Sequence, residues 1–192
     1  FRGRMDIDLN DNGLLQAEAV AKSLKKFSIK AIYSSPLKRA TQTAEKLVPL
    51  FNTPVQKKEG FIDINYGVWE GLSKNEVEKR FSEDYKIWIT KPQNLTFPQG
   101  ESLFLVKERA IKELEEVINK HQEEEIAIVS HRVVIKVILC YVLGIDNSNF
   151  WRIRQDTCAI NIFEKKEGDF IIYNINDTCH LKELNISQLA DF

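Results

Sequence analysis

The sequence predicts an α/β fold, a three-layer αβα sandwich built on a mixed, mostly parallel sheet. Short apolar runs rich in β-branched residues, at 31–34 and 126–130, are each followed by a segment of helical character. Strands that alternate with helices are typical of a parallel sheet covered on both faces. Two further β-rich runs, at 159–163 and 170–175, flank a Lys-Lys-Glu-Gly-Asp segment and predict an antiparallel hairpin, which makes the sheet mixed.

Apolar residues at helical spacing define the predicted helices. The first helix covers 11–27 and begins after Asn10, a favourable N-cap. The others are predicted at 36–50, 73–88, 101–121 and 133–143. Gly144 closes the last of them at its C′ position. Between these helices we expect a short strand at 53–57, an irregular segment at 61–71 and a loop at 91–100.

The junction between the first strand and the second helix is the most informative stretch. Ser35 stands at the N-cap and Pro36 at the first helical position, so Arg39 falls in the first turn. The free N–H groups of a helix N-terminus, together with an arginine, make a site for a phosphate. His131 likewise follows the apolar strand at 126–130. Because α/β enzymes build their sites at the C-terminal ends of strands, we expect Arg39 and His131 to face one cleft.

Taken alone, each of these side chains also fits a structural role. Arg39 fits a surface arginine, and His131 fits a hydrogen-bonded core histidine. Asp63 and Glu70 are further candidates, but taken alone these loop carboxylates also fit turn positions. Arg2 and Gly3 are candidates too, and taken alone they also fit a solvated chain terminus.

Composition narrows the possible partners and the location. The 192 residues predict one domain, since two ordinary domains need a longer chain. The 27 basic and 28 acidic residues give a net charge of −1, so neither a nucleic acid nor a membrane is expected as partner. The longest apolar run contains His131, Arg132 and Lys136, and no secretory signal is evident. Three cysteines without metal-ligand spacing indicate free thiols and a cytoplasmic protein without a metal site.

Five motifs follow one another along the chain. Residues 2–17 match Gln-Gly-x-x-Asp-x-x-Leu-(Thr/Ser)-x-x-Gly-x-x-Gln-Ala, with Arg2 for the first Gln and Asn10 for the Thr. Residues 35–44 match Ser-x-x-x-Arg-(Ala/Thr)-x-x-Thr-Ala. The other three are Asp-Ile-Asn-Tyr-Gly-Val-Trp-Glu-Gly at 63–71, Gly-Glu-Ser at 100–102 and Val-Ser-His at 129–131. In this order they resemble the histidine phosphatase (phosphoglycerate mutase-like) superfamily.

This resemblance implies a phosphomonoesterase that acts on a small phosphorylated metabolite through a phosphohistidine, without metal or cofactor. It implies that Arg39 and His131 bind the phosphoryl oxygens and that Asp63 is the general acid and base. It also implies substrate-binding positions at Arg2, Gly3, Glu70 and His180. The segments 149–151 and 176–181 resemble those of metal-independent phosphoserine phosphatases and α-ribazole phosphatases, and His180 there would recognise a substrate carboxylate.

The sequence departs from the family pattern at two places. The Arg-His-Gly motif, which holds the phosphate-accepting histidine of the family, is absent from the 192 residues. We therefore expect that histidine upstream of Phe1, and a domain at 1–192 that lacks its first strand. The acid position carries Asp63 where many relatives carry Glu, and Glu70 is the other carboxylate of this loop.

Two alternative functions stay open at this point. A phosphoglycerate mutase would use the same site, but mutases of the family carry an added segment that is short here, between Gly71 and Gly100. A catalytically inactive module that binds a phosphorylated ligand would lack the nucleophile altogether. The expected partners are a small phosphorylated substrate and a second copy of the chain, in a homodimer.

Overall fold

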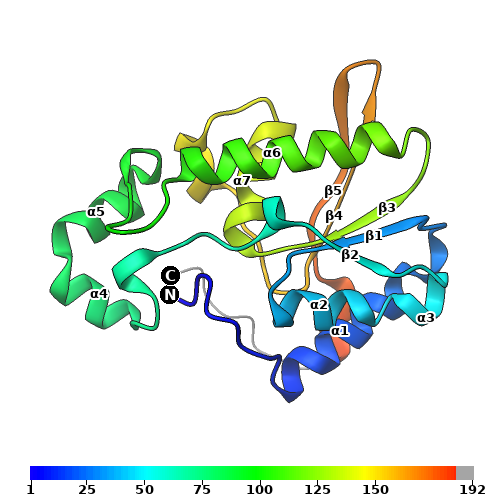
Figure 1. The fold of residues 1–192 in the computed structure, drawn as a ribbon, viewed down its shortest axis with the longest axis horizontal. Coiled ribbons are helices and arrows are strands. Elements are labelled where there is room, and N and C mark those ends of the chain that lie inside the picture. Colours follow the sequence, from blue (N-terminus) through cyan, green and yellow to red (C-terminus); the bar gives the residue numbers. More distant parts are fainter. Residues whose placement is uncertain (185–192) are drawn as a thin grey trace.

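A computed structural model describes residues 1–184 and shows the predicted α/β fold, whose three-stranded sheet is parallel (Figure 1). The strand order is β2-β1-β3. Its members are β1 (Ala31–Ser34), β2 (Val55–Lys57) and β3 (Ile126–Val129). β1 is the central strand, and Ser34 at its end is the partner of Val129 at the end of β3. The residues that follow these two strands therefore emerge side by side.

Helices cover both faces of this sheet (Figure 1). α1 (Asp11–Ser23) and α2 (Lys38–Glu45) lie on one face, and α6 (Leu103–Lys120) and α7 (Arg132–Val142) lie on the other. α3 (Val48–Phe51) follows α2, whereas α4 (Lys74–Arg80) and α5 (Ser82–Thr90) lie away from the sheet. Side chains alternate along β1 because successive residues of a strand point to opposite faces. Ala31 and Tyr33 pack in the core formed with α6 and α7, whereas Ile32 packs in the core formed with α1 and α2. The three predicted layers follow from this alternation.

Ser102 determines where the long helix α6 begins, and apolar spacing determines which of its faces is buried. The Ser102 hydroxyl accepts a hydrogen bond from the Leu105 amide, so Ser102 is the N-cap. One stripe of the helix is buried against the core, and it consists of Leu103, Val106, Ala110, Leu114 and Val117. This stripe is the one that helical spacing predicts.

Between the acid segment and α6, the chain makes a helical excursion over residues 69–97, which contains α4 and α5 (Figure 1). The excursion is closed at its base, where the Val68 amide donates to the Pro98 carbonyl at 3.1 Å. Gly67 has φ +55°, and a Cβ there would lie 2.0 Å from the Pro98 oxygen, so this contact requires glycine. Inside, the Phe97 ring packs edge-on against Trp69 and Trp88.

The predicted hairpin forms β4 (Ile160–Lys166) and β5 (Asp169–Asp177), which pair antiparallel. Glu167 and Gly168 both have positive φ at its tip, as a two-residue turn of this kind requires. Among residues 1–184 the hairpin is a separate two-stranded sheet and has no ladder to the parallel sheet.

Two predicted helices differ from the observed ones. The helix expected at 36–50 begins at Lys38, with extended Leu37 as its N-cap, and is interrupted before α3. Ser35 does not cap it, because its hydroxyl accepts from the Leu37 amide, which precedes the helix, and its own amide extends the strand pairing by donating to the Val129 carbonyl. The helix expected at 73–88 is divided into α4 and α5 at Phe81, whose backbone leaves the helical region.

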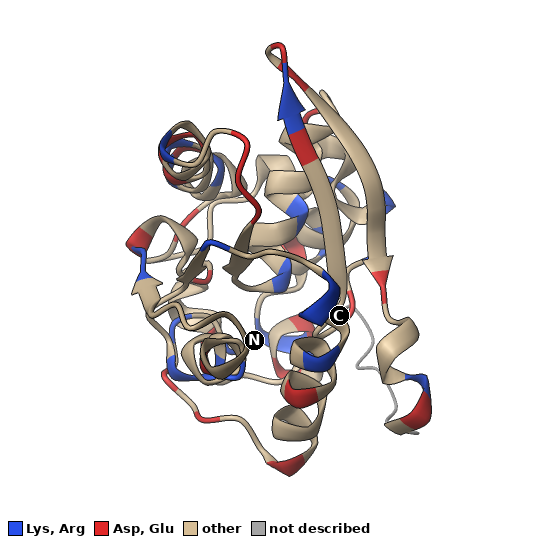
Figure 2. Ribbon diagram, turned by 90° about the vertical axis from the view of Figure 1, so that its right-hand side faces the viewer, with Lys and Arg blue, Asp and Glu red and all other residues tan. Residues whose placement is uncertain are grey.

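No helix within residues 1–184 combines the length and the apolar character that crossing a bilayer needs. Basic and acidic residues are mixed over the helices and the hairpin in the view of Figure 2. The near-neutral net charge thus reflects interspersed charges along the chain.

Candidate active site

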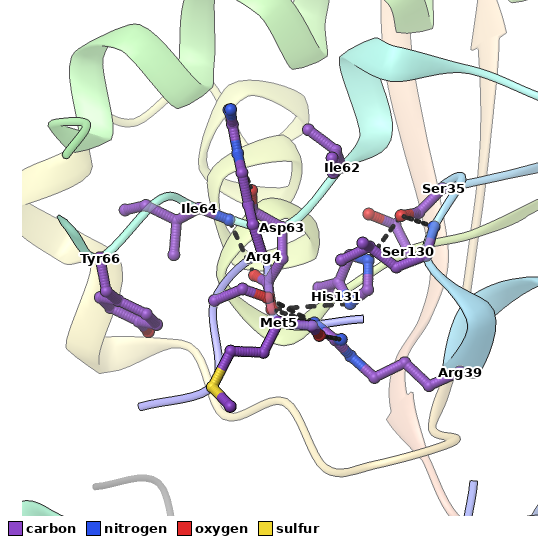
Figure 3. Close-up of polar contacts among 12 residues, drawn as sticks. Arg4, Met5, Ser35, Arg39, Ile62, Asp63, Ile64, Tyr66, Ser130 and His131 are labelled. Carbon is purple, nitrogen blue, oxygen red and sulfur yellow. Dashed lines mark hydrogen bonds and ion pairs between the residues drawn. The ribbon is translucent and has the colours of Figure 1, made fainter. Parts of the chain in front are cut away.

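Arg39, Asp63 and His131 meet at the C-terminal ends of β1 and β3 (Figure 3). Arg39 lies in the first turn of α2, and His131 is the residue immediately before α7. Asp63 comes from the irregular segment after β2. Its Oδ2 atom lies 2.9 Å from Arg39 Nη2 and 3.6 Å from His131 Nδ1. The structure thus brings the three side chains together around one carboxylate oxygen. The strand ends predict this proximity for Arg39 and His131, and the family resemblance predicts it for Asp63.

Ser35 holds the other side of the His131 ring. Its Oγ atom lies 2.7 Å from His131 Nε2 and also accepts a hydrogen bond from the Leu37 amide. The carboxylate of Asp63 can only accept, so it favours the ring proton on Nδ1, and Nε2 then accepts from the Ser35 hydroxyl. Ser35 is therefore part of the site, a role that its expected use as an N-cap concealed.

His131 is neutral at physiological pH. Burial disfavours the imidazolium and lowers the pKa of His131 to about 4. The positive charges of Arg39 and Arg109 act in the same direction, while the Asp63 carboxylate opposes them. A neutral, buried imidazole serves as a positioned hydrogen-bond donor, and a phosphate dianion beside it would favour its protonation.

Carbonyls of the N-terminal segment hold the Arg39 guanidinium. Nη1 donates to the Met5 carbonyl at 2.8 Å, and Nη2 donates to the Gly3 carbonyl at 2.7 Å. Gly3 has φ +51°, and a Cβ there would lie 2.2 Å from Glu70 Oε1. The segment consequently passes Glu70 so closely that only glycine is accommodated. Arg2, the preceding residue, is exposed.

Glu70 organises backbone in this structure. Its Oε1 atom accepts hydrogen bonds from the amides of Arg4 and Tyr66, at 2.8 and 3.3 Å. It thereby joins the N-terminal segment to the loop that carries Asp63. Of the two loop carboxylates, Asp63 is the one that contacts Arg39.

His180 makes its contacts away from this group. Its Nε2 atom lies 3.0 Å from the Cys158 carbonyl, and the residue lines a cavity of about 370 Å³ between α1 and the 3₁₀ helix Cys179–Leu184. Burial is the main reason why the pKa of His180 is lowered. Its predicted role at a substrate carboxylate stays a prediction.

Three further residues surround Asp63 and were missed in the sequence. The Asp63 carbonyl receives Arg4 Nε at 3.4 Å and Arg109 Nη2 at 3.2 Å, and Glu101 is paired with both arginines. Glu101 stands just before the Ser102 N-cap, and Arg109 lies in the second turn of α6, so helical spacing does not pair them. The Gly-Glu-Ser motif at 100–102 is the signal by which Glu101 could have been found.

Within residues 1–184, histidine, cysteine, aspartate and glutamate side chains form no group of three or more that could hold a metal ion. The positive groups around Asp63 are the guanidinium groups of Arg39, Arg4 and Arg109. This arrangement can bind an oxyanion between Arg39 and His131 and place a carboxyl group beside it.

Known proteins are similar to this chain in sequence and in fold. The chain is 35% identical over 186 residues to phosphoserine phosphatase 1 of Hydrogenobacter thermophilus, covering 97% of this chain and 88% of that protein. Its structure is similar to that of YhfR from Bacillus stearothermophilus, with a TM-score of 0.90 at 24% identity over 95% and 91% of the two chains. A phosphoserine phosphatase from Entamoeba histolytica, solved in complex with phosphoserine, has a TM-score of 0.83 at 28% identity, covering 94% and 90%.

The family model for branch 1 of the histidine phosphatase superfamily matches residues 1–178. That range includes all five motifs and the Arg39, Asp63 and His131 group. The predicted family and the predicted class of phosphatase are confirmed by this match and by the relatives. With the site built where those motifs place it, the chain belongs to the histidine phosphatase superfamily.

Proposed function

We propose that this protein hydrolyses the phosphomonoester of a small metabolite that also carries a carboxylate, with phosphoserine as the first candidate. The observation that carries the proposal is the convergence of Arg39, Asp63 and His131 on one oxygen at the ends of β1 and β3. Relatives support the substrate class: one is a phosphoserine phosphatase, and one related structure is in complex with 3-phosphoglyceric acid. Both phosphoserine and 3-phosphoglyceric acid are carboxylated phosphomonoesters.

Arg39 and His131 bind the non-bridging phosphoryl oxygens in this proposal. Phosphoryl transfer depends mainly on positioning and on compensating the charge of these oxygens. The Arg39 guanidinium supplies the positive charge, and the His131 imidazole supplies a positioned hydrogen bond. The guanidinium of Arg39 is held in place by two carbonyls and has little freedom left to lose on binding.

Asp63 is the proposed general acid and base. In the first half-reaction, the P–O bond to the alcohol breaks, a histidine nitrogen takes the phosphoryl group, and Asp63 gives its proton to the leaving oxygen. In the second, water attacks the phosphohistidine, and Asp63 takes up the water proton. Inorganic phosphate leaves, and both side chains return to their starting states.

The proposed phosphoryl acceptor is a histidine of an Arg-His-Gly motif beyond the printed residues. The three histidines of the 192 residues lie in other sequence contexts. The His131 ring is hydrogen-bonded to Ser35, and the His121 ring is hydrogen-bonded to Tyr33 and Glu124. Among residues 1–184, β3 and β4 each have a strand partner on one edge only, an arrangement compatible with a further strand.

The proposed enzyme is a cytoplasmic homodimer. Its three cysteines are free thiols, which supports a reducing compartment. Sedimentation of the full-length protein at several concentrations would test the dimer.

The test is release of inorganic phosphate by the full-length protein from phosphoserine, 3-phosphoglycerate and p-nitrophenyl phosphate. We expect turnover of phosphoserine and an acid-labile protein phosphate in samples quenched early. His131→Gln should remove most of the activity, whereas His121→Gln, at a histidine outside the site, should not. Release from none of the three substrates would contradict the phosphatase, and transfer to a second hydroxyl of the substrate in place of water would indicate a mutase.

A further inference from the structure

The segment that carries Asp63 has little regular structure to hold it. It runs from the 3₁₀ helix Glu59–Phe61 to the 3₁₀ helix Gly67–Trp69, each of three residues. A general acid acts only when its carboxyl group is held close to the leaving oxygen, and a displacement of about 1 Å costs about 10²-fold in rate. Contacts from outside the segment must therefore fix Asp63.

All five N–H groups of Arg109 in α6 donate hydrogen bonds, three to carbonyls of residues 60–63 and two to Glu101. Nη1 donates to the carbonyls of Gly60 and Ile62, at 2.9 and 2.7 Å. Nη2 donates to the Asp63 carbonyl at 3.2 Å and to Glu101 Oε2 at 3.1 Å, and Nε donates to Glu101 Oε1 at 2.9 Å. A guanidinium has five N–H donors in a fixed plane, and here five acceptors meet them.

Glu101 fixes the plane of that guanidinium. Both of its oxygens accept from Arg109, and Oε2 also accepts from the Asn65 amide at 2.9 Å. Burial works against the ionised carboxylate, but the hydrogen bonds from Arg109 and Asn65 outweigh it, so the pKa of Glu101 lies below its usual value. Arg109 thus holds the residues before Asp63, and Glu101 holds Asn65 after it.

The acid segment also lies directly on α6. A Cβ at Gly60 would lie 2.9 Å from the Arg109 carbonyl oxygen and 2.4 Å from the Glu113 Cβ. Backbone packed this closely cannot slide along the helix without breaking the contacts of Arg109. The carbonyl of Asp63 is therefore anchored on the α6 side, while its carboxylate faces Arg39.

We propose that Arg109, oriented by Glu101, is a positioning residue that sets where the Asp63 carboxyl group lies relative to the leaving oxygen. The proposal rests on the proposed phosphatase function and deepens it. Arg109 does not touch the substrate in this scheme. It acts through the backbone of residues 60–63, so its loss should impair proton donation while phosphate binding by Arg39 and His131 persists.

Two substrates separate this role from a general structural one. The alkoxide leaving group of phosphoserine needs a proton, whereas p-nitrophenolate is stabilised by its own ring and leaves without one. In the full-length protein we expect Arg109→Gln to lower kcat/KM for phosphoserine by about 10²-fold, the cost of a displaced acid. For p-nitrophenyl phosphate kcat/KM should change little. Lys112→Gln, at an exposed residue of the same helix, is the matched control.

Arg109→Lys and Glu101→Gln extend the test. Lysine offers a compact charge that cannot meet five acceptors in one plane, so the same selective loss is expected in weaker form. If Arg109→Gln fails to give a native circular dichroism spectrum, these two variants carry the comparison. Equal loss on both substrates, or no loss, would overturn the positioning role. Wild-type protein inactive on both substrates would instead overturn the phosphatase function and this inference together.

Discussion

The carboxylate of Asp63 is bound by Arg39 in this structure, with 2.9 Å between Oδ2 and Nη2 and both side chains 13% exposed. Arg39 thus already has an anionic partner from the protein itself. A phosphorylated substrate must share that guanidinium with Asp63 or displace it. Protonation of Asp63 removes its charge and leaves Arg39 to the substrate, so the form that binds the phosphoryl group best is also the form that can donate a proton.

Removing the charge of Asp63 should tighten anion binding. In Asp63→Asn we expect inorganic phosphate to bind about tenfold more tightly, the equivalent of one charged hydrogen bond of about 1.5 kcal/mol. Isothermal titration of the full-length variant measures this affinity. Glu70→Gln is the control, because Glu70 contacts backbone amides and not Arg39. Unchanged or weaker binding in Asp63→Asn would show that Asp63 does not compete for the anion.

The two carboxylates of the acid loop should differ in their effect on turnover. Asp63→Asn should lower kcat for phosphoserine by about 10²- to 10⁴-fold, the usual contribution of a general acid and base. Glu70→Gln keeps an oxygen that can accept from the amides of Arg4 and Tyr66, so we expect a loss of only a few-fold. Steady-state kinetics of both variants side by side decide the matter. The reverse order of losses would assign the acid role to Glu70.

The neutral state of His131 should make the protein sensitive to acid. Its pKa is about 4 in the folded protein against 6.5 for the ordinary group, so the unfolded chain binds a proton first as the pH falls. The contribution of His131 to stability is therefore complete above pH 6.5 and is lost between pH 6.5 and 4. The shift corresponds to about 3 kcal/mol. Urea unfolding over this range should show a smaller decline for His131→Gln, and an identical decline would contradict the buried neutral ring.

Activity should persist in EDTA and should not rise when Mg²⁺ or Mn²⁺ is added. In the proposed mechanism, the charge of the phosphoryl oxygens is compensated by the Arg39 guanidinium, with a hydrogen bond from His131, and no metal ion takes part. The measurement is kcat for phosphoserine before and after exhaustive treatment with chelator. Complete loss that is restored by a divalent cation would replace this mechanism with a metal-assisted one.

Local patterns were sufficient to predict the elements that build the site. Apolar strands followed by helices placed Arg39 and His131 at one edge of the sheet, and the structure brings both to Asp63. The family motifs predicted the acid segment, although its carboxylate comes from a stretch without regular structure. These predictions succeeded because each depends on residues close together in the sequence.

Contacts between distant segments could not be predicted in this way. Ser35 has the sequence of an N-cap, but its amide is taken by Val129 of the neighbouring strand, and its hydroxyl goes to His131. The hydrogen bonds from Arg109 to the acid segment depend on how that segment packs on α6. Arg109 and Asp63, for example, are 46 residues apart in the sequence. Tertiary packing decides such pairs, and local propensity carries little information about them.

The closed base of the helical excursion divides the chain into two parts with different tolerances. Because Val68 and Pro98 are hydrogen-bonded across it, the chain leaves and returns at a single point. Two residues of the excursion are also tied to the rest of the chain, because Glu70 accepts from the amides of Arg4 and Tyr66, and the Trp88 carbonyl accepts from Trp151 Nε1. A variant of this region should therefore keep Glu70 and Trp88, and changes of sequence are best tolerated at the exposed positions of α4 and α5 between them.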